Sequence, residues 1–327
     1  MNEFYRDRRV LITGGIGFIG SNLALRLTEL GAHVVLVASM LPAYGATLLN
    51  IEPIRGRVRV NFSDVRDQHS LSYIVREQEL IFSLAGQISH SESMSDPMTD
   101  LDINCRSQLS LLECCRHGNP EVKIVFASTR QIYGRPQYLP VDERHPLLPV
   151  DINGINKLAA EMYYALYDSV HGIETVSLRL TNTYGPRMDL ESDKKGFVGI
   201  FLRKAMRGER IQVYGTGQQR RDFNYVHDVV DALLLAGAND EIHGEVFNLG
   251  HPEPASLLEF LGVLQKFTDF EYEIVPFPSE AERIDIGDYC GDFAKFHEAT
   301  GWAPKVDLEA GLGKTIRYFR EIGDPGR

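Results

Sequence analysis

The sequence predicts an α/β fold in which helices cover both faces of a parallel sheet. Short runs of apolar, often β-branched residues alternate with longer stretches whose apolar residues recur at helical spacing. The first of these runs leads directly into a glycine-rich turn. This alternation is typical of a doubly wound sheet, and a chain of 327 residues leaves room for one large domain or two unequal lobes.

Five buried strands are expected in the first half, because each run is short, apolar and bounded by polar or glycine-containing segments. They are Val10–Ile12, Val34–Val37, Val58–Val60, Leu80–Phe82 and Lys123–Ala127. Helices are expected between them over Ile19–Leu30 and Asn104–His117. This order predicts a Rossmann-type, doubly wound parallel sheet over residues 1–180.

The second half is less regular. Helical patterns over Lys157–Ser169, Gly196–Arg207 and Ser256–Thr268 are separated by segments rich in Gly, Pro and Arg. We expect a smaller C-terminal lobe over residues 181–327, interleaved with the sheet. No change in composition marks a linker, so this boundary is soft.

Charge and cysteine content exclude several classes of partner. The chain has 34 Lys and Arg against 45 Asp and Glu, and the resulting net charge of −11 opposes diffuse binding to nucleic acid or to an anionic membrane. Its four cysteines form no CxxC pattern, which argues against a zinc site or a disulfide framework. No apolar run approaches the roughly 18 residues of a membrane span. We therefore expect a cytoplasmic protein without a metal.

The glycine-rich turn predicts a site for a dinucleotide. Residues 10–20 read VLITGGIGFIG, in which Gly14, Gly17 and Gly20 lie between the first strand and its helix. Glycines allow positive φ and let backbone N–H groups approach a pyrophosphate at the helix N-terminus, where the helix dipole favours negative charge. The alternative is a strand-to-helix turn that binds nothing.

The second strand usually ends before an acidic residue that binds the adenosine ribose. Here Ala38 and Ser39 follow it, and the first arginine or lysine beyond them is Arg55. The missing carboxylate removes the repulsion of a 2′-phosphate but adds no attraction for one. NAD is the favoured cofactor, with NADP left open.

Motifs over nearly the whole chain resemble those of the extended short-chain dehydrogenase/reductases, specifically the nucleotide-sugar epimerases and dehydratases. They are TGGIGFIG at 13–20, SDVRD at 63–67, LAG at 84–86, FASTRQIYG at 126–134, NGINKLAAE at 153–161, LRLTNTYGPR at 178–187, YGTGQQRRDFNYVHD at 214–228, VFNLG at 246–250 and GWAP at 301–304. The resemblance implies an enzyme that binds NAD on residues 1–180 and a nucleotide-diphosphate sugar on the C-terminal lobe.

The resemblance also implies a set of cofactor contacts. They are Gly14, Gly17, Phe18, Ile19, Gly20, Ser39, Asp64, Val65, Leu84, Ala85, Gly86 and Lys157. Among these, Lys157 would hold the nicotinamide ribose, while Thr129 would hydrogen-bond the hydroxyl at the reacting carbon. Asp64 has an alternative role as a turn cap, and Thr129 as a polar strand end.

The sequence departs from the family at the position of the catalytic tyrosine. In the Tyr-x-x-x-Lys motif, the i, i+4 spacing places the two side chains on one helical face, and the lysine lowers the pKa of the tyrosine. Four residues before Lys157 stands Asn153. An amide can orient a hydroxyl but cannot accept its proton, so the standard mechanism is in doubt.

A second departure follows Thr129, where family dehydratases carry an acid or serine and then a glutamate. Arg130 and Gln131 occupy these positions, and a glutamine cannot remove the C5 proton for dehydration. His90, Tyr133, Tyr138 and a water chain gated by Asn153 and Thr129 are the candidates for proton transfer. A loop histidine, a packed aromatic ring and a surface tyrosine are the alternative interpretations of these side chains.

The resemblance implies that the substrate's diphosphate is bound by arginines, whose forked donors suit phosphate. The candidate substrate contacts are Arg130, Asn182, Arg187, Tyr214, Arg221 and Arg283. Surface ion pairs with acids such as Asp222 and Glu282 are an alternative for the arginines, and core packing is one for Tyr214.

Three functions remain open. An epimerase that takes a hydride from the sugar onto NAD and returns it is the leading hypothesis; a dehydratase or decarboxylase and a non-catalytic binding protein are the alternatives. Family members commonly dimerise through a four-helix bundle, and Asn104–His117 and Lys157–Ser169 occupy the corresponding places. A homodimer is therefore expected.

Overall fold

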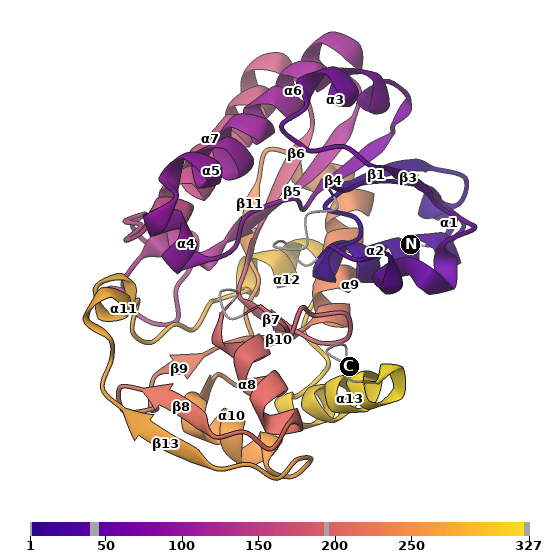
Figure 1. Cartoon of the computed structure of the whole chain (residues 1–327). Helices are drawn as coiled ribbons and strands as arrows, with labels where there is room; N and C mark the ends of the chain where they lie inside the picture. Colours follow the sequence, from indigo (N-terminus) through magenta and orange to yellow (C-terminus); the bar gives the residue numbers. More distant parts are fainter. Residues whose placement is uncertain (1, 40–45, 193–195, 324–327) are drawn as a thin grey trace.

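The computed structural model describes residues 2–39, 46–192 and 196–323. Seven parallel strands form one sheet in the order β11-β6-β5-β4-β1-β2-β3 (Figure 1). Their bounds are β1 Arg9–Thr13, β2 His33–Val37, β3 Arg59–Asn61, β4 Leu80–Ser83, β5 Lys123–Thr129, β6 Thr175–Leu180 and β11 Val246–Asn248. The Rossmann-type fold predicted from the sequence is confirmed.

Helices bury both faces of this sheet. On one face lie α2 Phe18–Glu29, α9 Val226–Ala238 and α12 Ala294–Thr300, and on the other α3 Gln68–Ile74, α6 Ser107–Gly118 and α7 Ile152–His171. Along β1, Val10 and Ile12 pack against the first group, while Leu11 packs against the second. Because both faces are covered, the strands are apolar throughout instead of alternating with polar residues.

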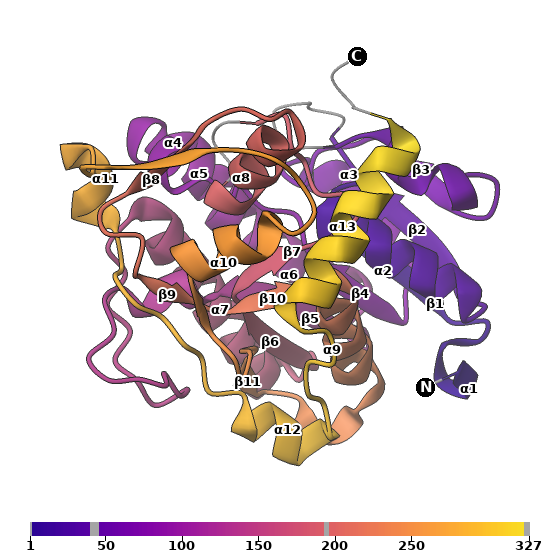
Figure 2. The same ribbon diagram turned by 90° about the horizontal axis from the view of Figure 1, so that it is seen from below.

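A smaller lobe has its own core. It contains α8 Phe197–Met206, α10 Leu257–Leu264 and α13 Leu308–Ile322, and the strand pairs are β7 Asn182–Tyr184 with β10 Phe223–Tyr225, β8 Ile211–Tyr214 with β13 Tyr272–Val275, and β9 Arg220–Arg221 with β12 Ala255–Ser256. Figure 2 shows α10 and α13 side by side on the outer surface of this lobe. The predicted boundary at residue 180 falls at the end of β6, although β11 and α9 return to the large sheet.

Short helices complete the described chain. They are α1 Asn2–Tyr5, α4 His90–Ser95, α5 Pro97–Leu101 and α11 Ser279–Ile284. Segments of 3-10 helix lie at η2 Leu48–Ile54, η3 Val75–Glu77, η5 Arg130–Tyr133 and η6 Asp240–Ile242, and a π-helical turn η4 at Asp102–Arg106. Among the described residues, no helix is both long and apolar enough to cross a bilayer.

Candidate active site

A cavity of about 370 Å³ opens where the carboxyl ends of the parallel strands meet the smaller lobe. Its walls come from the segments that follow β1, β2, β4, β5 and β6 and from the first turns of α7 and α8. Ligands bind at this edge in doubly wound folds, because loops from several strands converge there. Every cofactor contact implied by the resemblance lines this cavity, as do Thr129, Asn153, His90 and Asn182.

The glycine turn forms the floor of the cavity. Gly14 has φ +70°, and a Cβ on it would lie 3.0 Å from the backbone of Ala85. A Cβ on Gly20 would lie 2.3 Å from the carbonyl oxygen of Gly14. The turn therefore requires glycine, and it delivers the chain into α2 with the first helical N–H groups at the cavity wall, which fits a pyrophosphate.

The segment after β4 is held close to the glycine turn. The hydroxyl of Thr13 accepts hydrogen bonds from the backbone N–H groups of Leu84 (3.1 Å) and Ala85 (3.2 Å). At Gly86, a Cβ would approach Nζ of Lys157 to 3.1 Å. A side chain at residue 86 would therefore crowd the end of Lys157.

Lys157 is buried on α7, and its Nζ donates to the backbone oxygen of Ala127 (3.0 Å). Burial lowers the pKa of Lys157 to about 8, although the carboxylate of Asp100 opposes this shift. A ribose hydroxyl would give this ammonium group a further acceptor, so the lysine fits the role that the resemblance implies.

Asp64 and Val65 line the cavity beside Ser39. The carboxylate of Asp64 accepts two hydrogen bonds from the Arg66 guanidinium, at 2.9 and 2.8 Å. These bonds hold the pKa of Asp64 below its usual value despite partial burial. The Asp64 carboxylate thus faces the cavity region already paired with Arg66.

Asn153 is tied into a buried amide network. Its Nδ2 donates to the backbone oxygen of Gln87 (2.8 Å) and to Oδ2 of Asp100 (3.1 Å). Asp100 is fully buried and also accepts from Nδ2 of Asn156 (2.8 Å). Sequence reasoning missed Asp100 and Gln87, because neither belongs to a motif that names a chemical role.

The remaining proton-transfer candidates differ in position. His90 lines the cavity, and its Nδ1 lies 2.9 Å from Oδ2 of Asp151. Tyr133 is buried, and its hydroxyl donates to Oδ1 of Asn248 (2.7 Å). The exposed Tyr138 donates to Asp142 (2.7 Å). Neither tyrosine lines the cavity.

The family model described as "NAD dependent epimerase/dehydratase family" matches residues 10–250. The chain belongs to this family. It is 32% identical to a putative UDP-glucose 4-epimerase of Methanocaldococcus jannaschii over 95% of this chain and 98% of that protein. It is 33% identical to UDP-glucuronic acid decarboxylase 1 of Xenopus tropicalis over 97% of this chain and 73% of that protein.

Among solved structures, the UDP-glucose 4-epimerase of Thermotoga maritima with UDP-glucose superposes with a TM-score of 0.86 at 31% identity, covering 96% of this chain and 99% of that one. These matches confirm the family that the sequence motifs indicate. They also confirm that the protein is an enzyme of the NAD-dependent epimerase/dehydratase class. The relatives include both epimerases and decarboxylases, so the reaction itself is a separate question.

Two of the arginines predicted to bind the substrate, Arg130 and Arg221, lie close to each other beside Thr129. Arg130 donates from Nη2 to Oδ1 of Asn182 (3.2 Å), while its Nη1 is buried without a partner. Burial and the neighbouring charge of Arg221 lower the pKa of Arg130 to about 10. Arg221 pairs with Asp285 at 3.3 Å, and both arginines lie beyond the cavity lining.

The other three predicted contacts also lie outside the cavity lining. Arg187 donates to the backbone oxygen of Asn50 (2.9 Å) and to Oδ1 of Asn22 (3.2 Å), so it links the smaller lobe to the glycine-turn helix. Tyr214 is 40% exposed and packs against the ring of Phe277. Arg283 is exposed on α11. Their roles toward a substrate stay predictions.

Proposed function

We propose that this protein is an NAD-dependent epimerase of a nucleotide-diphosphate sugar, which it oxidises transiently at one carbon. The observation that carries the proposal is that one cavity combines the glycine turn, Lys157 and Thr129. When bound there, NAD supplies a hydride acceptor that can return the hydride to the same sugar.

Each lining residue has a role that follows from its position in the cavity. The glycine turn and the start of α2 would hold the pyrophosphate, Lys157 the nicotinamide ribose, and Thr129 the hydroxyl of the reacting carbon. Asn182 lines the cavity, and its Oδ1 accepts a hydrogen bond from Arg130, which does not line it. It would therefore face the sugar or its diphosphate.

Gln131 supports epimerisation over dehydration. Its side chain is buried, and Nε2 donates to Oδ2 of Asp151 (2.9 Å). A neutral amide held in this way can neither remove a C5 proton nor reach the cavity lining.

A homodimer through α6 and α7 forms part of the proposal. Along α7, an outward stripe of four apolar side chains is between 49% and 65% exposed: Ile155, Met162, Leu166 and Val170. Exposed apolar stripes of this kind mark association surfaces. A second copy of the chain would bury the stripe.

The proposed reaction is tested by screening nucleotide sugars for thermal stabilisation of the NAD-loaded protein, followed by mass and NMR analysis of the best ligand after incubation. An epimerase yields a product of unchanged mass. A product of lower mass would identify a dehydratase or decarboxylase instead, and no conversion of any ligand would indicate a non-catalytic binding protein.

A further inference from the structure

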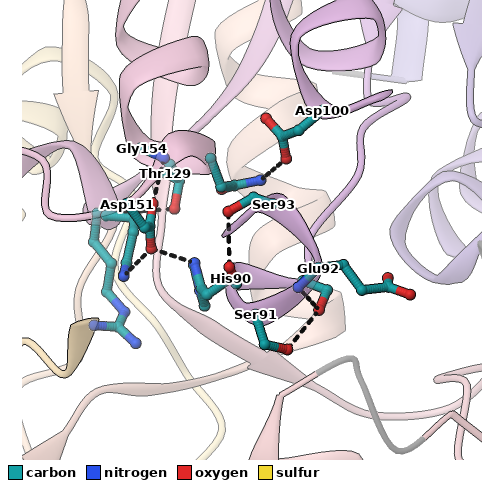
Figure 3. Close-up of polar contacts among 12 residues, drawn as sticks. His90, Ser91, Glu92, Ser93, Asp100, Thr129, Asp151 and Gly154 are labelled. Carbon is teal, nitrogen blue, oxygen red and sulfur yellow. Dashed lines mark hydrogen bonds and ion pairs between the residues drawn. The ribbon is translucent and has the colours of Figure 1, made fainter. Parts of the chain in front are cut away.

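His90 lines the cavity, and its ring faces the buried carboxylate of Asp151, which does not line the cavity (Figure 3). His90 is the first residue of α4, its side chain is 38% exposed, and its Nδ1 lies 2.9 Å from Oδ2 of Asp151. Nδ1 is the ring atom that faces this carboxylate. His90 and Asp151 are 61 residues apart in sequence and meet only through the fold.

Asp151 is held rigidly behind His90. Its side chain has no exposed surface, and its Oδ1 accepts the backbone N–H of Gly154 (2.6 Å) as the N-cap of α7. Its Oδ2 accepts from Nε2 of Gln131. Burial alone would raise the pKa of Asp151, but the contacts with His90, Gly154 and Gln131 lower it below its usual value. The carboxylate is thus ionised and faces the imidazole.

The two departures from the family pattern both lie beside this pair. A glutamate in place of Gln131 would bring a second carboxylate against the buried Oδ2 of Asp151, where like charges repel. Asn153 occupies the tyrosine position but commits its amide to Gln87 and Asp100. Among the described residues that line the cavity there is no tyrosine, and the half-exposed His90, backed by the buried Asp151, lies there instead.

Five titratable side chains line the described cavity: Asp64, His90, Glu92, Lys157 and Asp189. Asp64 is bound by Arg66, and Lys157 donates to the Ala127 carbonyl. His90 is the single imidazole among them, and imidazole changes charge near neutral pH, as reversible proton transfer requires.

We propose that His90 is the catalytic acid–base of the reaction and that Asp151 is its positioning residue; this inference rests on the proposed function. During oxidation, Nε2 of His90 would take the hydroxyl proton at the reacting carbon. The O–H electrons would form the C=O bond as the C–H hydrogen leaves as hydride, for which NAD, when bound, would be the acceptor. The return of hydride draws the same proton back. Asp151 at Nδ1 keeps the proton on that nitrogen and leaves the Nε2 lone pair free.

His90→Ala in the full-length, NAD-loaded protein is expected to slow turnover by about 100- to 10,000-fold, the usual contribution of a general acid–base. Thermal stabilisation by NAD should be unchanged, and added imidazole should restore part of the rate. The matched control is His243→Ala, because His243 forms a similar pair with Asp168 (3.3 Å) outside the cavity. This control should turn over at the wild-type rate.

Asp151→Asn keeps an oxygen to cap Gly154 but removes the charge that faces His90. We expect kcat to fall at least tenfold with little change in KM. Nitrogen-15 NMR, with the His90 signal assigned by its loss in His90→Ala, should show Nδ1 protonated in the wild type and a mixture of tautomers in Asp151→Asn. This readout does not depend on turnover.

Turnover of His90→Ala within threefold of the wild type would overturn the inference while leaving the proposed function intact. An unchanged His90 tautomer in Asp151→Asn would overturn the role of Asp151. If the wild type converts no nucleotide sugar, the proposed function fails, and the inference fails with it.

Discussion

Replacing Lys157 with methionine should change how stability depends on pH, because burial lowers the pKa of this lysine from 10.5 to about 8. The folded protein therefore binds fewer protons than the unfolded chain between these values, and the free energy of unfolding rises with pH across this window. Below pH 8 the lysine is charged in both states, and its burial costs about 3 kcal/mol.

Lys157→Met removes this cost, and with it a hydrogen bond to Ala127 that contributes about 1 kcal/mol. The stability of the variant relative to the wild type should thus be greatest at pH 7. This difference in the free energy of unfolding should be about 2 kcal/mol smaller at pH 9.5, where Lys157 of the folded wild type has released its proton. Urea unfolding of both proteins without cofactor at the two pH values measures this difference.

The same variant should lose most of the thermal stabilisation that NAD gives the wild type. Lys123→Met is the matched control, because Lys123 is also buried but lies outside the cavity, where it pairs with Asp240. An unfolding difference that stays constant from pH 7 to 9.5 would refute the buried-lysine reasoning. Equal loss of NAD stabilisation in the two variants would refute its location at the cofactor.

Three further substitutions test other parts of the structure. Gly20→Ala should weaken NAD binding about tenfold or more in calorimetry, because its Cβ would clash with the Gly14 carbonyl, whereas Gly56→Ala, with open space around it, should bind normally. Asn153→Tyr should not raise turnover and should lower the free energy of unfolding by about 1–3 kcal/mol, since buried Asp100 loses a donor; a large gain in activity would contradict this. Leu166→Arg should shift the sedimentation of the protein from dimer to monomer. Ile274→Arg, at a similarly exposed position on β13, should leave the dimer intact, and a Leu166→Arg protein that still sediments as a dimer would refute the proposed interface.

The sequence predicts the parts of the fold that depend on local order. The five runs from Val10 to Ala127 lie within the strands β1, β2, β3, β4 and β5 or within one residue of them, because each is a short apolar segment with clear boundaries. The pattern of apolar residues does not predict strands β6 and β11. β11 has three residues and pairs with a strand about 70 positions earlier, so only the fold identifies it.

The same distinction applies to the candidate site. The glycine turn is contiguous, and its conformation follows from the residues that compose it. The pair of His90 with Asp151 and the network of Asn153 with Asp100 join residues 53 to 61 positions apart. In the sequence alone, neither Asp151 nor Asp100 belongs to a motif that indicates a chemical role. Their burial, which gives them chemical meaning, comes from packing of α4, α5 and α7.

The central claim is that the protein oxidises a nucleotide sugar only transiently. The most direct test mixes the NAD-loaded protein with the nucleotide sugar that stabilises it most, follows the 340 nm absorbance of reduced cofactor, and determines the mass of the product. We predict no net accumulation of reduced cofactor and a product isomeric with the substrate. Stoichiometric accumulation of reduced cofactor, or a product lighter by water or carbon dioxide, would contradict the account.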